Sequence, residues 1–170
     1  MAESTFDIHL VCGATGAGKS TYAENLAQSL GGLRFSIDEW MQCLHNADQP
    51  SEISYDWLYE RVLRNCAQMR DIAEKLAPLG IPSIFDCGLT KKEERTVFTK
   101  WAANHGFSVQ LHFIDIPTNV RWQRVQKRNT ERKDTFQFEV TREMFDFIDA
   151  IWEAPSPEEM QTYAGKQITS

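Results

Sequence analysis

The sequence predicts an α/β fold, in which helices pack against a parallel sheet. Three observations predict it. Short apolar stretches alternate with longer segments of helical periodicity, the order of elements that a parallel sheet requires. A glycine-rich stretch joins the first of these strands to the first helix. The chain has 170 residues, enough for one domain with a core of its own, so we expect a single domain over residues 1–170.

The first part of the chain contains two predicted strands, each followed by a helix. Residues 6–12 form the first strand, and the helix after it carries apolar residues at i, i+3, i+4 and i+7 spacing. These residues are Ala23, Leu26, Ala27 and Leu30. The pattern stops at Gly31 and Gly32, where a left-handed cap costs little. A short strand over 34–37 then leads into a helix from about Asp38.

The longest helical pattern follows a turn around residues 49–51. Its apolar face consists of Leu58, Val62, Cys66, Met69, Ala73 and Leu76, and the helix ends before Pro78 and Gly80. The next strand spans 81–86, with a proline near its start, where a missing N–H is best tolerated. A helix over about 91–105 and a strand over 107–115 follow.

The last part of the chain is predicted to be mainly helical. Pro117 opens a helix, and a final amphipathic helix is indicated by Met144, Phe145, Ile148, Ile151 and Trp152. Residues 154–159 are predicted to break this helix. From about residue 153 we expect a C-terminal tail, for which a short strand near 162–168 and a loose tail fit equally.

Composition and charge exclude several classes of protein. The net charge is −6, which argues against general attraction to nucleic acid or anionic membranes. No apolar stretch approaches the length of a membrane span, and the N-terminus lacks the features of a signal peptide. The four cysteines lack zinc-site spacing and are expected to be reduced. We therefore expect a cytoplasmic protein that does not bind membranes.

The stretch "GATGAGKST" carries the strongest functional signal. Gly13, Gly18, Lys19 and Ser20 form the pattern G-x-x-x-x-G-K-S between a strand and a helix, the context that this motif needs to bind phosphate. Its backbone N–H groups and the helix N-terminus would bind phosphates, Lys19 would bridge the β- and γ-phosphates, and Ser20 would bind Mg²⁺. The predicted nucleotide-binding residues are Gly13, Ala14, Thr15, Gly16, Ala17, Gly18, Lys19, Ser20 and Thr21.

Other motifs narrow the class of nucleotide-binding protein. A GTPase needs an Asp-x-x-Gly after a strand and a guanine-reading Asn-Lys-x-Asp, and the sequence has neither. Motor ATPases are normally larger and supply more sensor elements than this length allows. A kinase is favoured over both.

Asp38 is the candidate general base. It follows the second predicted strand, and residues at the carboxyl ends of parallel strands face the ligand crevice. A carboxylate there can orient a substrate hydroxyl and accept its proton during phosphoryl transfer. Asp is also a favoured helix N-cap, so capping is the alternative role, and one aspartate could serve both.

Asp86 is the candidate second metal ligand beside Ser20. It ends the predicted strand over 81–86, which resembles the strand leading to the acidic residue that holds Mg²⁺ in phosphate-loop enzymes. The alternative is a turn-forming aspartate before Gly88.

A basic run marks a predicted lid over about 125–140. Residues 121–133 contain six basic residues and one acidic residue, Glu131. The basic residues are Arg121, Arg124, Lys127, Arg128, Arg132 and Lys133. The spacing predicts that Arg121, Arg124 and Arg128 share one helical face, where guanidinium groups could neutralise the transferring phosphoryl group. The alternative is a solvated face whose buried side consists of Trp122 and Val125.

Taken together, these residues resemble the small P-loop kinases related to polynucleotide kinase, zeta toxin and chloramphenicol phosphotransferase, a group that includes ATP-binding proteins of the AAA_33 type. The match rests on "GATGAGKST", Asp38, "FDCGLTKKEER" with Asp86 and Arg95, and "RWQRVQKRN". The resemblance implies a P-loop NTPase fold with an Arg-rich lid and a parallel sheet in the order 2-3-1-4, to which a fifth strand can be added. It also implies ATP as donor, Asp38 as general base and Arg124 or Arg128 as lid arginines.

One position departs from the family pattern. Polynucleotide kinases carry an arginine three residues after the catalytic aspartate, where Met41 stands here. We therefore expect an ATP- and Mg²⁺-dependent kinase that phosphorylates a hydroxyl of a small molecule, with Lys19, Asp38, Arg124 and Arg128 as catalytic residues. Arg124 would also contact the nucleotide. The alternatives are a nucleic-acid 5′-hydroxyl kinase and a nucleotide-gated binding module with a protein partner. The oligomeric state stays open.

Overall fold

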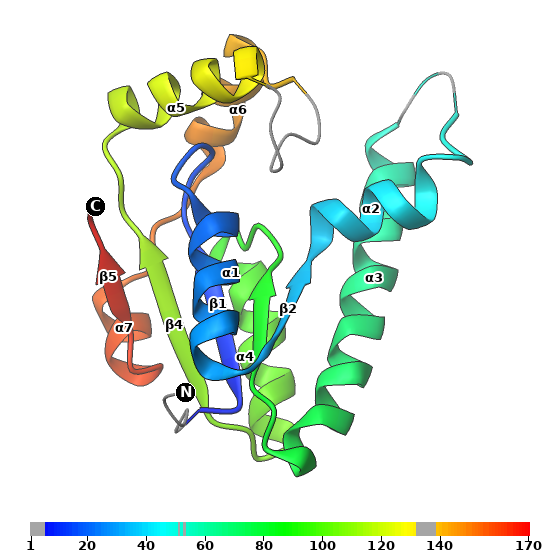
Figure 1. Cartoon of the computed structure of the whole chain (residues 1–170), viewed down its shortest axis with the longest axis vertical. Coiled ribbons are helices and arrows are strands. Elements are labelled where there is room, and N and C mark those ends of the chain that lie inside the picture. The colour runs from blue at the N-terminus through cyan, green and yellow to red at the C-terminus, as the bar shows by residue number, and fades with distance from the viewer. Residues whose placement is uncertain (1–5, 51, 53, 132–138) are drawn as a thin grey trace.

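A five-stranded parallel sheet forms the centre of the computed structural model, which describes residues 6–50, 52, 54–131 and 139–170 (Figure 1). The strand order is β2-β3-β1-β4-β5. The strands are β1 (Ile8–Cys12), β2 (Leu33–Ser36), β3 (Ser83–Asp86), β4 (Val109–Ile114) and β5 (Lys166–Ile168). The α/β fold and the order of the first four strands are therefore confirmed. Because β5 pairs with β4, the predicted fifth strand also forms, and the loose-tail alternative is wrong.

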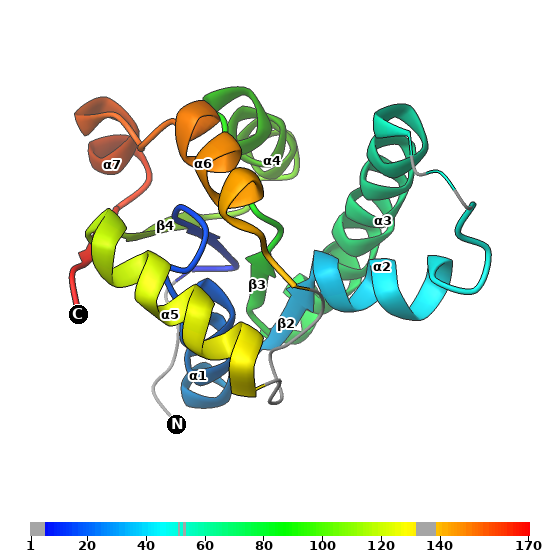
Figure 2. The same cartoon turned by 90° about the horizontal axis from the view of Figure 1, so that it is seen from above.

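Helices cover both faces of this sheet. They are α1 (Lys19–Leu30), α2 (Ile37–His45), α3 (Tyr55–Leu76), the 3₁₀ helix η1 (Ala77–Leu79), α4 (Lys92–Asn104), α5 (Thr118–Glu131), α6 (Arg142–Ile151) and α7 (Pro157–Thr162). Figure 2 shows α1 on one side of the sheet and α3, α4 and α7 on the other. None of the helices within the described residues combines the length and apolar character needed to cross a membrane.

The two faces of β1 serve different helices. Ile8, Leu10 and Cys12 pack in a core that includes residues of α3 and α4, whereas Val11 packs with Ala23 and Ala27 of α1. This alternation follows from the two-residue period of a strand. All of β1 is therefore buried, as expected for the central strand of a parallel sheet.

The helix α7 is a correction to the sequence prediction, which treated residues 154–159 only as a break. Ser156 caps the helix by accepting a hydrogen bond from the Glu159 N–H, and the Glu159 carboxylate accepts one from the Ser156 N–H. Pro157 occupies the first turn, where its missing N–H costs nothing. The segment thus ends α6 and starts a new helix within a few residues.

Arg95 connects this C-terminal part to the loop after β3. The side chain is 1% exposed and donates hydrogen bonds to the Glu159 carboxylate, the Glu153 carbonyl and the Leu89 carbonyl. Leu89 has a positive φ of 51°, a conformation that a residue with a side chain adopts at some cost. Arg95 therefore stabilises the backbone of the loop rather than acting in the cavity described below.

A buried histidine pair lies between β1, β4 and α1. The Nδ1 atom of His9 is 2.9 Å from Nε2 of His112, and the Tyr22 hydroxyl is 2.8 Å from Nδ1 of His112. His9 also bonds the Phe6 backbone. The chain of bonds is satisfied when both rings are neutral, with Tyr22 donating to His112 and His112 donating to His9. Burial lowers the pKa of His9 to about 4 and that of His112 to about 3.

We expect acid to destabilise the fold through this pair. Both histidines are neutral in the folded state but take up protons below about pH 6.5 when unfolded, so stability falls as the pH drops from 6.5 towards 4. The loss between pH 7 and pH 5 should be about 2 kcal/mol per histidine. Urea unfolding at both pH values measures it. His112→Gln should lose less stability on acidification, because one of the two buried histidines is gone. The control Tyr22→Phe keeps both histidines and should keep the full pH dependence of the unfolding free energy. Equal stability of the wild type at pH 7 and pH 5 would contradict the prediction.

Candidate functional site

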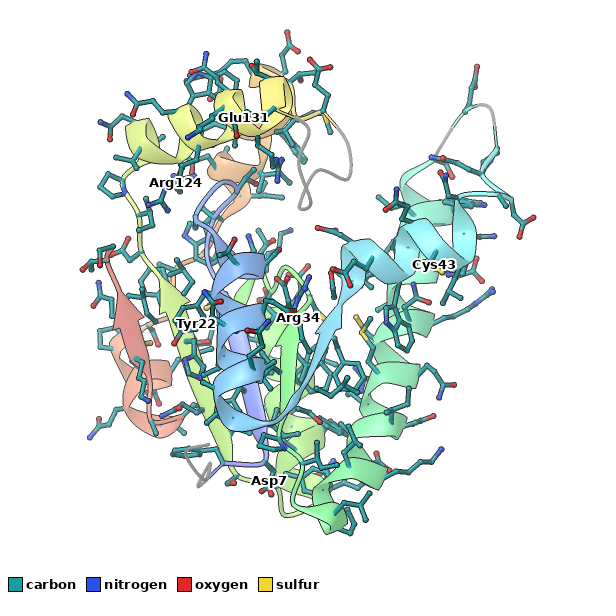
Figure 3. All side chains as sticks on the ribbon, in the orientation of Figure 1. Asp7, Tyr22, Arg34, Cys43, Arg124 and Glu131 are labelled. Atoms are coloured by element: carbon teal, nitrogen blue, oxygen red, sulfur yellow. The ribbon has the colours of Figure 1, made fainter. Side chains whose placement is uncertain are left out.

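A cavity of about 710 Å³ lies beyond the carboxyl ends of the strands, bordered by the phosphate loop, α2, α5 and α6 (Figure 3). Most residues predicted from the sequence line it: Gly13, Thr15, Gly16, Gly18, Lys19, Ser20, Thr21, Asp38, Asp86, Arg124 and Arg128. The structure thus brings together segments that are up to about a hundred residues apart in the sequence.

The phosphate loop, residues 13–18, is folded tightly against neighbouring backbone. A Cβ atom on Gly13 would lie 2.7 Å from the Ile114 carbonyl oxygen, and one on Gly16 would lie 2.6 Å from the Arg121 carbonyl oxygen. Gly16 also has φ +78°, which favours glycine. Within the loop, Ala14 and Ala17 are buried, and their carbonyl oxygens accept hydrogen bonds from Lys19 and Arg124, respectively.

Lys19 lies at the start of α1, with its ammonium 3.4 Å from the Ala14 carbonyl oxygen. Burial lowers its pKa, and the carboxylates of Asp86 and Asp38 act in the opposite direction. The two aspartates therefore favour the charged form of the lysine, which is the form that binds phosphate.

Asp38 lies in the first turn of α2 and lines the cavity. Ser36, and not Asp38, is the N-cap of this helix, because its hydroxyl accepts a hydrogen bond from the Glu39 N–H. The capping alternative for Asp38 is therefore wrong. Desolvation within the open cavity and the nearby Asp86 raise the pKa of Asp38, an exposed residue, while Lys19, Arg128 and Arg34 lower it. A carboxylate with a raised pKa is a stronger base than an ordinary one.

Asp86 ends β3 next to Ser36 of β2 and is 5% exposed. Its carboxylate lies 3.5 Å from Nε of Arg34. Ser20 and Asp86 line the same cavity, and a hydroxyl plus one carboxylate are the hard oxygen ligands that Mg²⁺ uses beside substrate phosphates. These residues fit Mg²⁺, and no group of three or more His, Cys, Asp or Glu side chains suited to a metal occurs among the described residues.

Arg121 corrects the prediction that three arginines share one functional face. Its guanidinium is buried and donates to the carbonyl oxygens of Ile116 and Thr15 and to the Asp149 carboxylate, the last at 2.6 Å. The guanidinium is therefore bound by the protein itself. Arg121 therefore connects the phosphate loop to α6 and does not line this cavity.

Arg124 and Arg128 do face the cavity. Arg124 reaches from α5 over the phosphate loop and donates to the Ala17 carbonyl at 3.0 Å, close to Gly18. The Nε atom of Arg128 is buried and makes no hydrogen bond with the described residues. The fully solvated face proposed as the alternative is thus not observed, although Val125 is buried as that alternative expected. The lid segment 132–138, with Arg132 and Lys133, lies outside the described residues.

The sequence analysis missed an ionic group on the wall of the cavity. Arg34 of β2 contacts Glu24, Glu39 and Asp86, and all four residues line the cavity. No local motif signals this group, because its members come from α1, β2, α2 and β3. Only the pairing of β2 with β3 places Arg34 beside Asp86.

Comparison with known families identifies the chain. The model of AAA_33, described as an AAA domain, matches residues 8–155. The chain belongs to the AAA_33 family. No protein with a curated description matches this AAA_33 domain.

Solved structures of similar fold have low sequence identity to this AAA_33 domain. A Mycobacterium tuberculosis APS kinase, CysC, in complex with AMPPNP and APS is 21% identical, with a TM-score of 0.66 over 96% of this chain and 88% of that one. Chaetomium thermophilum Kti12 with ADP-AlF3 is 16% identical, with a TM-score of 0.68 and the same coverage. An unliganded sugar kinase from Janibacter sp. HTCC2649 is 18% identical, with a TM-score of 0.64 over 96% and 85%. These likenesses confirm the P-loop NTPase fold.

Arg121 and Arg124 should respond differently to truncation. Arg121→Met leaves Asp149 without its buried partner, so it should lower the free energy of unfolding by about 3 kcal/mol in urea titrations. Arg124→Met removes an exposed side chain, so its stability should stay within about 0.5 kcal/mol of the wild type. Arg124→Met should instead weaken the affinity for a fluorescent ATP analogue about tenfold. Equal losses of stability in both variants would contradict this assignment.

Proposed function

We propose that this protein transfers the γ-phosphoryl group of ATP, with Mg²⁺, to a hydroxyl group of a small molecule. The observation that carries the proposal is the position of Asp38, which lines the same cavity as the phosphate loop and interacts electrostatically with Lys19 and Arg128. A carboxylate of raised pKa beside a phosphate site is what activation of a hydroxyl requires.

The donor half of the site would be formed by the phosphate loop and α5. Backbone N–H groups of the loop and the ammonium of Lys19 would bind the β- and γ-phosphates. Arg124 and Arg128, which both line the cavity, would stabilise the negative charge on the transferring group. Ser20 and Asp86 would hold Mg²⁺, which neutralises phosphate charge when bound.

Asp38 would act on the acceptor. Its carboxylate would accept a hydrogen bond from the acceptor hydroxyl, orient the oxygen towards the γ-phosphorus and take the proton as the new P–O bond forms and the bond to the β-phosphate oxygen breaks. Because the transition state is loose, correct positioning of the hydroxyl contributes more than the strength of the base.

The acceptor class is supported by two observations. The cavity of about 710 Å³ is of a size that takes small ligands. Met41 stands where polynucleotide kinases have a phosphate-binding arginine, and its sulfur accepts a hydrogen bond from the Asn65 amide at 3.3 Å. This position therefore offers no charge for the phosphate of a nucleic-acid acceptor, and a small molecule is favoured.

Asp38→Asn should abolish phosphoryl transfer and leave Mg·ATP binding nearly intact, because the amide keeps the shape of the side chain but cannot accept the proton. ADP release from Mg·ATP should rise when the small-molecule fraction of a cell extract is added to the wild type, and the variant should lose this stimulation. Asp48→Asn, which removes an exposed carboxylate after α2, is the matched control. ATP binding without stimulated ADP release would favour a nucleotide-gated binding module, and wild-type stimulation in Asp38→Asn would remove Asp38 from the mechanism.

A further inference from the structure

Arg34 lines the cavity but has no role in the reaction proposed above. Its guanidinium makes three contacts with carboxylates: Nη1 lies 3.0 Å from Glu24, Nη2 lies 2.7 Å from Glu39, and Nε lies 3.5 Å from Asp86. Each carboxylate belongs to a different element, namely α1, α2 and β3. One side chain of β2 therefore connects three elements of the cavity wall.

The connection is made in a partly enclosed environment. The side chain of Arg34 is 15% exposed and that of Asp86 is 5% exposed, whereas Glu24 and Glu39 lie closer to solvent. The contact with Asp86 is therefore screened less than a surface ion pair, whereas the contacts with Glu24 and Glu39 are open to water. A planar guanidinium also fixes the direction of its partners. Two of the three contacts, those with Glu24 and Glu39, are hydrogen bonds from separate nitrogens of the guanidinium. A lysine would keep the charge but presents its donors from a single nitrogen, so it would not reproduce this geometry.

The three connected elements carry residues proposed for catalysis. The helix α1 begins with Lys19 and Ser20, α2 carries Asp38 directly before Glu39, and Asp86 is itself one of the three partners. Figure 3 shows Arg34 between α1 and β2, below the start of α2. A change in these contacts would move Asp38 relative to the phosphate loop.

We propose that Arg34 is a positioning residue: by binding Glu24, Glu39 and Asp86 together, it holds α1, α2 and β3 at the spacing that places Asp38 opposite the phosphate loop. The inference rests on the proposed role of Asp38. It assigns to Arg34 no contact with ATP or with the acceptor.

The same guanidinium contributes to the charge around Asp38. Among the described residues, the charged groups that act on Asp38 are Asp86 of β3, Lys19 of α1, Arg128 of α5 and Arg34 of β2. Asp86 raises the pKa of Asp38 and the three cations lower it. Loss of the Arg34 charge should therefore raise the pKa of Asp38 and shift the acidic limb of the rate profile to higher pH.

The test compares Arg34→Gln, Arg34→Lys and the control Arg64→Gln, which removes an arginine of α3 whose side chain is exposed and pairs with Glu60. Titration of each purified full-length variant with a fluorescent ATP analogue measures its nucleotide affinity. Assays of Mg·ATP turnover across pH measure the rate. ¹³C labelling and NMR follow the titration of the Asp38 carboxyl carbon. Asp38→Asn assigns that signal.

We expect Arg34→Gln to bind the ATP analogue with wild-type affinity, to turn over Mg·ATP about tenfold more slowly, and to titrate Asp38 at higher pH. Arg34→Lys should restore the Asp38 titration but only part of the rate, because it restores the charge without the two hydrogen bonds to Glu24 and Glu39. Arg64→Gln should match the wild type in all three measurements. If Arg34→Gln does not fold, Glu39→Gln, which removes only the contact with α2, should show the slower turnover.

Two results would overturn the proposal. The first is an Asp38 signal that titrates in Arg34→Gln as it does in the wild type. This result would leave Arg34 a purely structural role. If the same variant also raised only the KM for an acceptor, Arg34 would instead be assigned to acceptor binding. The other is full turnover in that variant or in Glu39→Gln. The NMR titration does not depend on turnover. If the wild type had no activity, that result would count against the proposed kinase function, and the Asp38 signal would still decide the role of Arg34.

Discussion

The phosphate loop depends on direct contact with the start of α5. The carbonyl oxygen of Arg121 approaches so closely that Gly16 leaves no space for a Cβ atom, and the Arg121 guanidinium bonds the Thr15 carbonyl in return. A loop that contacts both the carbonyl and the buried guanidinium of one residue has little freedom to change its shape. The arrangement keeps its N–H groups preorganised, so binding a phosphate requires little reordering of the backbone.

The cavity brings charges of both signs together. Lys19, Arg124 and Arg128 line it together with Asp38, Asp86, Glu24 and Glu39, and Arg34 contacts three of these carboxylates. Cations and carboxylates so close together create the mixed field in which a phosphate and a carboxylate base can share one site. Lys19 and Asp38 also depend on one another, because each favours the charged form of the other.

The sequence predicted those parts of the fold and site that depend on local patterns. The phosphate loop, the strand order implied by the family resemblance and the cavity position of Asp38 belong to this group. Arg121 was misassigned because helical spacing places it in line with Arg124 and Arg128, while the sequence does not reveal that Asp149 and two backbone carbonyls enclose it. The helix α7 was missed because Ser156 and Pro157 signal the end of one helix and the beginning of the next equally well.

The contacts of Arg95 have a consequence for folding during synthesis. Arg95 holds the loop at Leu89, and its other partners, Glu153 and Glu159, lie 58 and 64 residues further along the chain. The neighbouring Gly88 and Thr90 line the cavity, so this wall cannot be completed until the region of α7 has left the ribosome. The phosphate loop is translated early, but the opposite wall of its cavity gains the Arg95 contacts only after a segment near the C-terminus has been made.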